Sequence, residues 1–221
     1  LARILDAVVA AVDVPVTLKT RLGFLNGEEN ILRVAKRAED AGVAALALHG
    51  RTREDMYLNT ARYELIREVK KNINIPLIAN GDIDSPEKAK YVLDYTGADA
   101  VMIGRAAQGR PWIFREIAHY LETGEHLAAP EIVEVKQVLM GHLAELYQFY
   151  GEYSGCRIAR KHIAWYTKGL RSSNEFRQNM YKVENTADQA KVVESYFDQL
   201  LDQGRRMSDV QVEQVNLLEI K

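Results

Sequence analysis

The sequence is poor in the residues that build metal sites and disulfide frameworks. Its 221 residues include one cysteine, Cys156, and five histidines. A single cysteine excludes an internal disulfide and any metal site made of several thiolates. The histidines are scattered apart from His119 and His126, which flank a predicted turn, so we expect no zinc site.

Long apolar runs are also missing. No run approaches the ~20 residues that cross a bilayer, and residues 1–12 lack the zones of a signal peptide. We therefore expect a cytoplasmic protein with no membrane partner. The first residue is a leucine, and the helix pattern that follows it has no preceding strand, so we expect the chain to begin inside a larger fold.

The sequence has little net charge, with 29 basic residues against 31 acidic ones. This balance alone does not indicate a nucleic-acid partner. The charges are unevenly placed, however, because residues 156–182 contain seven basic residues and one acid, Glu175. The basic residues are Arg157, Arg160, Lys161, Lys168, Arg171, Arg177 and Lys182. A segment this one-sided suggests a surface that meets an anionic partner.

The first part of the chain repeats a strand-then-helix rhythm. Apolar runs without alternation predict buried parallel strands, of which the last two should be central. The predicted strands are 14–19, 44–48, 75–79 and 100–103. Four such units with right-handed crossovers form either half of an eight-stranded barrel or a small open sheet. An open sheet this apolar would expose both edges, so we predict an α/β fold, the C-terminal half of a (β/α)8 TIM barrel.

Residues after 124 carry only helix patterns. They are predicted at 132–150, 157–169, 173–182 and 187–201, with a break at 151–155. We therefore divide the chain into a partial TIM-barrel domain at 1–124, an all-α helical bundle domain at 125–203 and a flexible tail at 204–221.

Two strand ends within residues 75–112 predict a phosphate site. Asn80-Gly81 suggests a hairpin, but Ser85 and Pro86 have the pattern of a capped helix start, so the turn should lead into a helix. Gly104-Arg105, followed by Gly109, leaves the next strand. Barrels frequently bind phosphate with the loops after their last two strands. Glycines admit an anion to backbone N–H groups, and an arginine adds a charged fork.

Polar side chains follow all four predicted strands. They are Lys19, Arg21, His49, Arg51, Asn80, Asp82 and Arg105. Strand carboxyl ends are where barrel enzymes place their sites. A phosphate site with a lysine and a histidine suggests a phosphorylated planar cofactor. Structural alternatives stay open, in which Lys19 pairs with Asp82 and His49 donates to a carbonyl.

These blocks resemble the tRNA-dihydrouridine synthases. The resemblance is carried by VTLKTR at 16–21, HGRTR at 49–53, ANGDI at 79–83 and GADAVMIGRAA at 97–107. GRPWIF at 109–114 and RIARKH at 157–162 are most similar to the bacterial B-type branch. The resemblance implies an FMN-binding barrel followed by a helical tRNA-binding domain. Its activity would be the reduction of uridine in tRNA to 5,6-dihydrouridine, driven by NADPH, with FMN passing a hydride to a flipped-out uridine.

The resemblance also implies roles for single residues. Lys19 would contact the isoalloxazine ring near N1 and O2, and His49 would lie beside the ring. Arg51 and Arg53 would face either flavin or RNA phosphate. The ribityl phosphate would be held by Asn80, Gly81, Asp82, Gly104 and Arg105. The tRNA would meet a helix face formed by Arg157, Arg160, Lys161 and Lys168, for which a merely solvated face is the alternative.

The family's first strands and the loop with its uridine-protonating cysteine have no counterpart in this sequence. The general acid is therefore expected upstream, and Cys156 is interpreted as a small structural residue. Two other functions stay open: a non-catalytic RNA-binding remnant, and another phosphate-binding TIM-barrel enzyme such as a sugar-phosphate isomerase. Unpaired strand edges also predict self-association of the half barrel.

Overall fold

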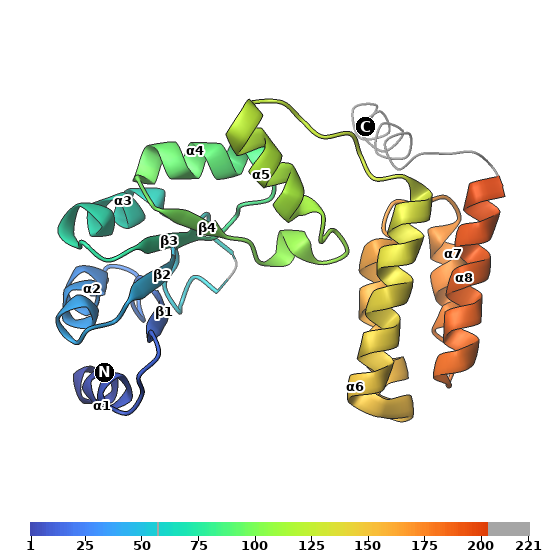
Figure 1. Cartoon of the computed structure of the whole chain (residues 1–221), viewed down its shortest axis with the longest axis horizontal. Helices are drawn as coiled ribbons and strands as arrows, with labels where there is room; N and C mark the ends of the chain where they lie inside the picture. Colours follow the sequence, from blue (N-terminus) through green and yellow to red (C-terminus); the bar gives the residue numbers. More distant parts are fainter. Residues whose placement is uncertain (57, 203–221) are drawn as a thin grey trace. The chain divides into compact units, whose positions relative to one another are not determined.

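The computed structural model describes residues 1–56 and 58–202 (Figure 1). The predicted tail at 204–221 lies outside these residues. The described chain forms two compact units, of which the first consists of residues 1–107 and 113–126. The second consists of residues 108–112 and the chain from 127 onward. The segment 108–112 thus packs with the helical part of the chain, although it precedes helix α5 of the first unit.

A four-stranded parallel sheet forms the centre of the first unit (Figure 1). Its strands are β1 (Thr17–Arg21), β2 (Ala45–His49), β3 (Leu77–Asn80) and β4 (Ala100–Met102), and they lie in the order of the sequence. All three pairings are parallel. The predicted α/β fold with four successive strand–helix units is therefore confirmed.

The prediction that both last strands are central is right for β3 and wrong for β4. Strand β4 pairs with β3 alone within the described chain, and Ala100 at its start is exposed. The reason lies in the order of the sheet, because each new strand is added at the same edge. The apolar sequence of β4 is consistent with a strand that is covered by further protein.

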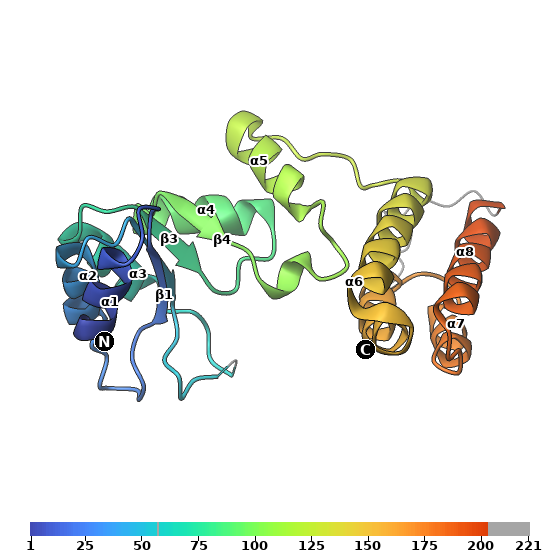
Figure 2. The same ribbon diagram turned by 60° about the horizontal axis from the view of Figure 1, so that its bottom comes forward.

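Helices cover one face of the sheet (Figure 2). The helices of this unit are α1 (Ala2–Ala10), α2 (Ile31–Asp40), α3 (Tyr63–Asn72), α4 (Pro86–Thr96) and α5 (Ile113–Thr123). Leu46, Leu48 and Leu77 are fully buried against helical residues such as Ile66 and Val92. The opposite face alternates with this one along each strand. It carries Lys19, Ala47 and Ile78 side by side in register, and Lys19 is exposed.

The turn after β3 leads into helix α4, as the sequence predicts. The Ser85 Oγ accepts a hydrogen bond of 3.1 Å from the backbone N–H of Lys88, and Pro86 is the first helical residue. The helix ends at Gly97, whose φ of 70° is in the left-handed region. The capping residues therefore set both ends of the helix that separates the two predicted phosphate-binding loops.

The second unit contains helices α6 (Ile132–Tyr166), α7 (Ser173–Met180) and α8 (Thr186–Asp202). Their shared core includes Leu139, Leu143, Ile163 and Phe197, all at most 1% exposed. The predicted break at 151–155 is narrower than expected. Only Gly151 leaves the helical region, with φ 73° and ψ 180°, and the helix resumes after it.

Candidate functional site

The strand carboxyl ends border a cleft of about 680 Å³. All seven residues predicted to hold the cofactor line it: Lys19, His49, Asn80, Gly81, Asp82, Gly104 and Arg105. Arg21 and Arg51 line it as well. The sheet register explains this, because Arg21, His49, Asn80 and Met102 are paired in one row across the four strands. A smaller hollow of about 530 Å³ lies between α7 and α8.

Asn80 connects Lys19 to the edge strand. The Lys19 Nζ donates a hydrogen bond of 3.1 Å to Asn80 Oδ1, and Asn80 Nδ2 donates one of 2.8 Å to the carbonyl oxygen of Met102. The two bonds fix the orientation of the amide. Partial burial lowers the pKa of Lys19, and the positive charge of Arg21 lowers it further. The alternative in which Lys19 pairs with Asp82 is therefore wrong.

Asp82 binds two arginines and a backbone amide. Its Oδ2 accepts hydrogen bonds of 2.7 Å from Arg51 Nη2 and 2.8 Å from the N–H of Ala61, and its Oδ1 lies 3.4 Å from Arg105 Nη2. Burial acts to raise the pKa of this carboxyl, but the hydrogen bonds from Ala61 and Arg51 outweigh it, so the pKa lies below its usual value. Asp82 is a carboxylate that repels phosphate itself but holds Arg105, whose exposed side chain can attract one.

Gly81 lets the loop pass close to His49. Its φ is 124°, and a Cβ added here would lie 2.8 Å from the Ala61 Cβ and 3.0 Å from the His49 Cδ2. A side chain at this position would therefore displace His49 and the segment around Ala61. The Tyr63 hydroxyl donates a 2.7 Å hydrogen bond to the Gly81 carbonyl and secures the same turn.

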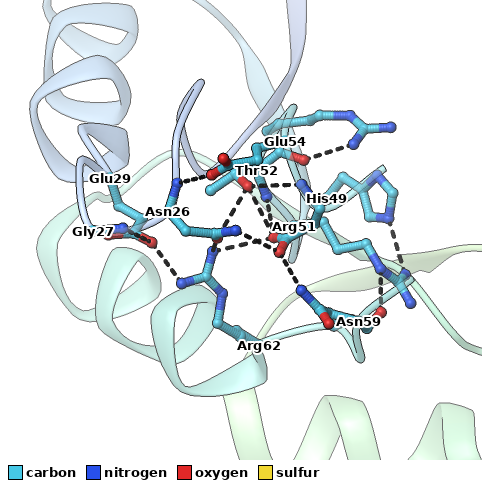
Figure 3. Close-up of polar contacts among 12 residues, drawn as sticks. Asn26, Gly27, Glu29, His49, Arg51, Thr52, Glu54, Asn59 and Arg62 are labelled. Atoms are coloured by element: carbon cyan, nitrogen blue, oxygen red, sulfur yellow. Dashed lines mark hydrogen bonds and ion pairs between the residues drawn. The ribbon is translucent and has the colours of Figure 1, made fainter. Parts of the chain in front are cut away.

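Arg51 is buried, with 3% of its surface exposed. Its Nε donates a 2.6 Å hydrogen bond to the carbonyl oxygen of Asn59, and its Nη1 lies 3.4 Å from His49 Nε2 (Figure 3). The interpretation in which Arg51 meets RNA phosphate is therefore wrong, because its guanidinium is enclosed by protein groups. Arg53, two residues further along, is exposed.

His49 is neutral at physiological pH. The residue is 7% exposed. Burial lowers its pKa most, and the positive charges of Arg21, Lys19 and Arg51 lower it further, to about 4, against a small opposing effect of Asp82. The cleft therefore combines lysine and arginine cations with an uncharged imidazole.

A polar network beside the cleft, which the sequence analysis missed, joins the loops at 22–30 and 50–62 (Figure 3). Its centre is Asp55, which is 4% exposed. Its carboxylate accepts hydrogen bonds from Thr52 N, Thr52 Oγ1, Asn26 Nδ2, Asn59 Nδ2 and Arg62 Nη2. The only sequence signal is the density of Asn, Asp, Glu and Arg in both loops. The network holds the Asn59 carbonyl that anchors Arg51.

Gly109 contacts the helical part of the chain. It lies in the second unit, with φ 73°, and a Cβ added to it would stand 2.4 Å from the carbonyl carbon of Trp165. The glycine therefore permits backbone contact with the end of helix α6. The residues that line the cleft do not include this glycine, and its predicted anion-binding role stays a prediction.

The predicted tRNA-binding residues do not all lie free on helix α6. Arg157 and Lys161 are exposed, and each lies over an aromatic ring one helical turn away, at 4.4 Å from the centroid of Tyr153 and 5.9 Å from that of Trp165. Lys168 is exposed just beyond the helix. Arg160 is partly buried and donates a 2.9 Å hydrogen bond to the carbonyl oxygen of Val183.

Cys156 is a buried residue of the helical unit, with 1% of its surface exposed. Its Sγ lies 3.6 Å from the carbonyl oxygen of Val183. Burial raises the pKa of the thiol, so the residue has no character of an activated thiolate. In the described part of the chain, no helix has the length and apolarity to span a bilayer, and no three His, Cys, Asp or Glu side chains are grouped as metal ligands would be.

The geometry defines a parallel α/β protein whose strand ends border a cleft lined by lysine, arginine and aspartate side chains, followed in the sequence by a helical unit. Residues 1–201 match the family described as Dihydrouridine synthase (Dus), and the chain belongs to this family.

Relatives named tRNA-dihydrouridine synthase B match most of the chain. Those from Shewanella oneidensis, Vibrio vulnificus and Pseudomonas aeruginosa are 58%, 57% and 56% identical over 90%, 89% and 92% of it. The matched region spans 61% of each relative's length. A solved (S)-3-O-geranylgeranylglyceryl phosphate synthase from Thermoplasma acidophilum aligns over 52% of both chains, with 20% identity and a TM-score of 0.37, which is too low to support an inference.

Proposed function

We propose that this chain is the FMN-binding and tRNA-binding portion of a tRNA-dihydrouridine synthase of the B type. The whole enzyme would reduce uridine in tRNA to 5,6-dihydrouridine with electrons from NADPH. The observation that carries the proposal is the cleft, in which all seven predicted cofactor residues meet although they lie in or after four different strands. The names of the relatives supply the reaction and the substrate.

The residues of the cleft fit FMN in their chemistry. Bound FMN would supply the hydride for the uridine. Arg105 and the Gly104 backbone would hold its phosphate, with Asp82 acting as the positioning residue for Arg105. Lys19, oriented by Asn80, would place a positive charge beside the ring, where reduction adds negative charge. His49 and the Asn80–Gly81 turn complete the wall of the site.

We propose that the sheet is half of a (β/α)8 barrel. Support comes from its parallel order, from the helices of the first unit that cover one face, and from the apolar edge strand β4. The remaining strands, together with the cysteine that protonates the uridine, would then lie in the part of the relatives that this chain does not match. The described chain itself contains one cysteine, which is buried in the helical unit.

The helical unit is proposed to bind tRNA. Arg157, Lys161 and Lys168 are the exposed cations of the predicted face. Tyr153, which is 67% exposed, lies under the Arg157 guanidinium and adds an aromatic surface of the kind that meets unstacked RNA bases. Arg160 contributes by holding α6 to the segment after α7.

The phosphate contact is tested by titrating FMN into the wild-type chain and into Arg105→Ala, following the flavin fluorescence. A charge-assisted hydrogen bond contributes about 1.5–3 kcal/mol, so the substitution should weaken FMN binding by roughly tenfold to a hundredfold. Lys90→Ala is the control, because Lys90 is an exposed helix residue paired with Asp94 outside the cleft. Equal affinities for all three proteins would reject this phosphate site. FMN binding without tRNA binding would favour another phosphate-binding barrel enzyme, and the reverse would favour an RNA-binding remnant.

A further inference from the structure

The buried guanidinium of Arg51 uses each of its three nitrogens toward a different group. The Nε donates to the Asn59 carbonyl at 2.6 Å, the Nη2 donates to Asp82 at 2.7 Å, and the Nη1 lies 3.4 Å from His49 Nε2. The first two contacts fix the plane of the guanidinium. The Asn59 side chain is itself bonded to Asp55, at the centre of the loop network (Figure 3). These contacts therefore fix the position of Arg51 Nη1, the nitrogen that faces His49.

A guanidinium carries hydrogen-bond donors and no acceptor. At the contact with Arg51, the His49 Nε2 must therefore offer its lone pair, and the proton of the neutral ring lies on Nδ1. We propose that Arg51 is a positioning residue that holds His49 as the neutral tautomer protonated on Nδ1. What this tautomer is used for rests on the proposed function, because His49 lines the cleft assigned to the flavin.

The charges around His49 favour the same state. The charged groups that bear on the ring include the cations of Arg21, Lys19 and Arg51 and the carboxylate of Asp82. A protonated ring would add a positive charge to a buried place that already holds these three cations. The ring therefore lines the cleft as an uncharged imidazole whose Nδ1 carries the donor. Lys19 supplies the positive charge, and the acid that protonates the uridine is a different group.

The tautomer can be read directly by NMR of the full chain labelled with ¹⁵N-histidine. Long-range proton–nitrogen correlations distinguish protonated from unprotonated ring nitrogens, and His49→Gln identifies the His49 signals among those of the five histidines. We expect, at pH 7, a protonated Nδ1 and an unprotonated Nε2, with no protonation until well below pH 6. A proton on Nε2 in the wild-type protein, or rapid exchange between the two tautomers there, would by itself overturn the proposal.

Arg51→Met tests whether the arginine is the cause. It removes the donor and one cation while keeping an unbranched side chain, so we expect His49 to lose its single tautomer and to titrate nearer its ordinary pKa of 6.5. Arg67→Met, an exposed arginine on α3, is the control and should leave the His49 signals unchanged. An unchanged tautomer in a folded Arg51→Met protein would reject the role of Arg51. If the proposed function is wrong, the wild-type chain will instead fail to bind FMN while His49 still shows the expected tautomer.

Discussion

At the scale of single residues, the cleft contains cations that are proposed to bind the ligand and polar residues that orient these cations. Asp82 repels an anion, yet one of its carboxylate oxygens binds Arg51 and the other binds Arg105. Asn80 similarly presents the Lys19 ammonium while bonded to the backbone of β4. A change in either positioning residue should therefore affect ligand binding through the cation that it orients.

His49 makes the stability of the fold depend on pH. Its pKa is about 4 in the folded chain against an ordinary 6.5, so between these values the unfolded chain binds the additional proton and stability falls as the pH falls. One pKa unit corresponds to about 1.4 kcal/mol. We expect roughly 2 kcal/mol of unfolding free energy to be lost between pH 7 and pH 5 through this residue.

Urea unfolding of the wild type and His49→Gln at both pH values measures this contribution. The glutamine variant cannot take up the proton, so its loss of stability over the same pH range should be smaller by about that amount. Identical pH dependence of the two proteins would mean that His49 is not held neutral. His162, whose pKa burial also lowers, is present in both proteins and cancels in the comparison.

The sequence could predict which residues meet in the cleft, but not their partners. The carboxyl ends of parallel strands lie at one edge of the sheet. The polar residues at and just after these ends, among them Lys19, His49 and Asn80, therefore had to converge. The pairing of Lys19 with Asn80 instead of Asp82, and the burial of Arg51, depend on how the loops at 22–30 and 50–62 close. That closure is set by contacts such as Asn26 with Asp55, 29 residues apart, which no local pattern encodes.

At the scale of elements, Gly109 is expected to control the packing of the chain against helix α6. Gly109→Ala places a Cβ 2.4 Å from the Trp165 carbonyl carbon and forces a left-handed φ on alanine. Gly124→Ala has the same sign of φ, at 77°, with no atom within 4 Å, and is the control. The left-handed conformation costs about 1–2 kcal/mol in both proteins, and the clash adds to it only at Gly109.

Thermal unfolding followed by circular dichroism compares these two variants. We expect the Gly109 variant to lose at least about 2 kcal/mol more stability than the Gly124 variant, in the range of overpacked sites. If both variants unfold at the same temperature, the close contact between Gly109 and Trp165 does not exist in solution.

Helix α6 yields a prediction that separates binding from folding. Replacing Arg157, Lys161 and Lys168 with alanine should weaken tRNA binding and reduce its dependence on salt, with a log–log slope smaller by roughly 2 to 3, because each lost phosphate contact lowers the slope by about 0.7–0.9. Arg160→Ala should instead lower stability, since it leaves the Val183 carbonyl without this donor.

Filter binding across a salt series, with unfolding curves for each variant, checks both statements. A triple variant with unchanged salt dependence would leave this face as ordinary solvated surface. A fully stable Arg160→Ala protein with reduced tRNA affinity would mean that Arg160 contributes to tRNA binding.

At the scale of the whole molecule, the order of strands and helices was the most predictable feature. Apolar runs and the Ser85 cap place the elements within a few residues, because burial and capping are local properties of the sequence. The edge position of β4 was missed, since its apolar residues indicate a covered strand and carry no information on the covering segment. The chain spans 61% of the length of the relatives it matches, and self-association through the strand edges stays a prediction.

The most direct test of the account is a calorimetric titration of the chain with FMN and, separately, with riboflavin, which lacks the phosphate. We predict one FMN per chain and at least tenfold weaker binding of riboflavin, because the Gly104–Arg105 turn, with Arg105 oriented by Asp82, would form the proposed phosphate site. Equal affinity for the two flavins, or binding of neither, would contradict the assignment of this cleft to FMN.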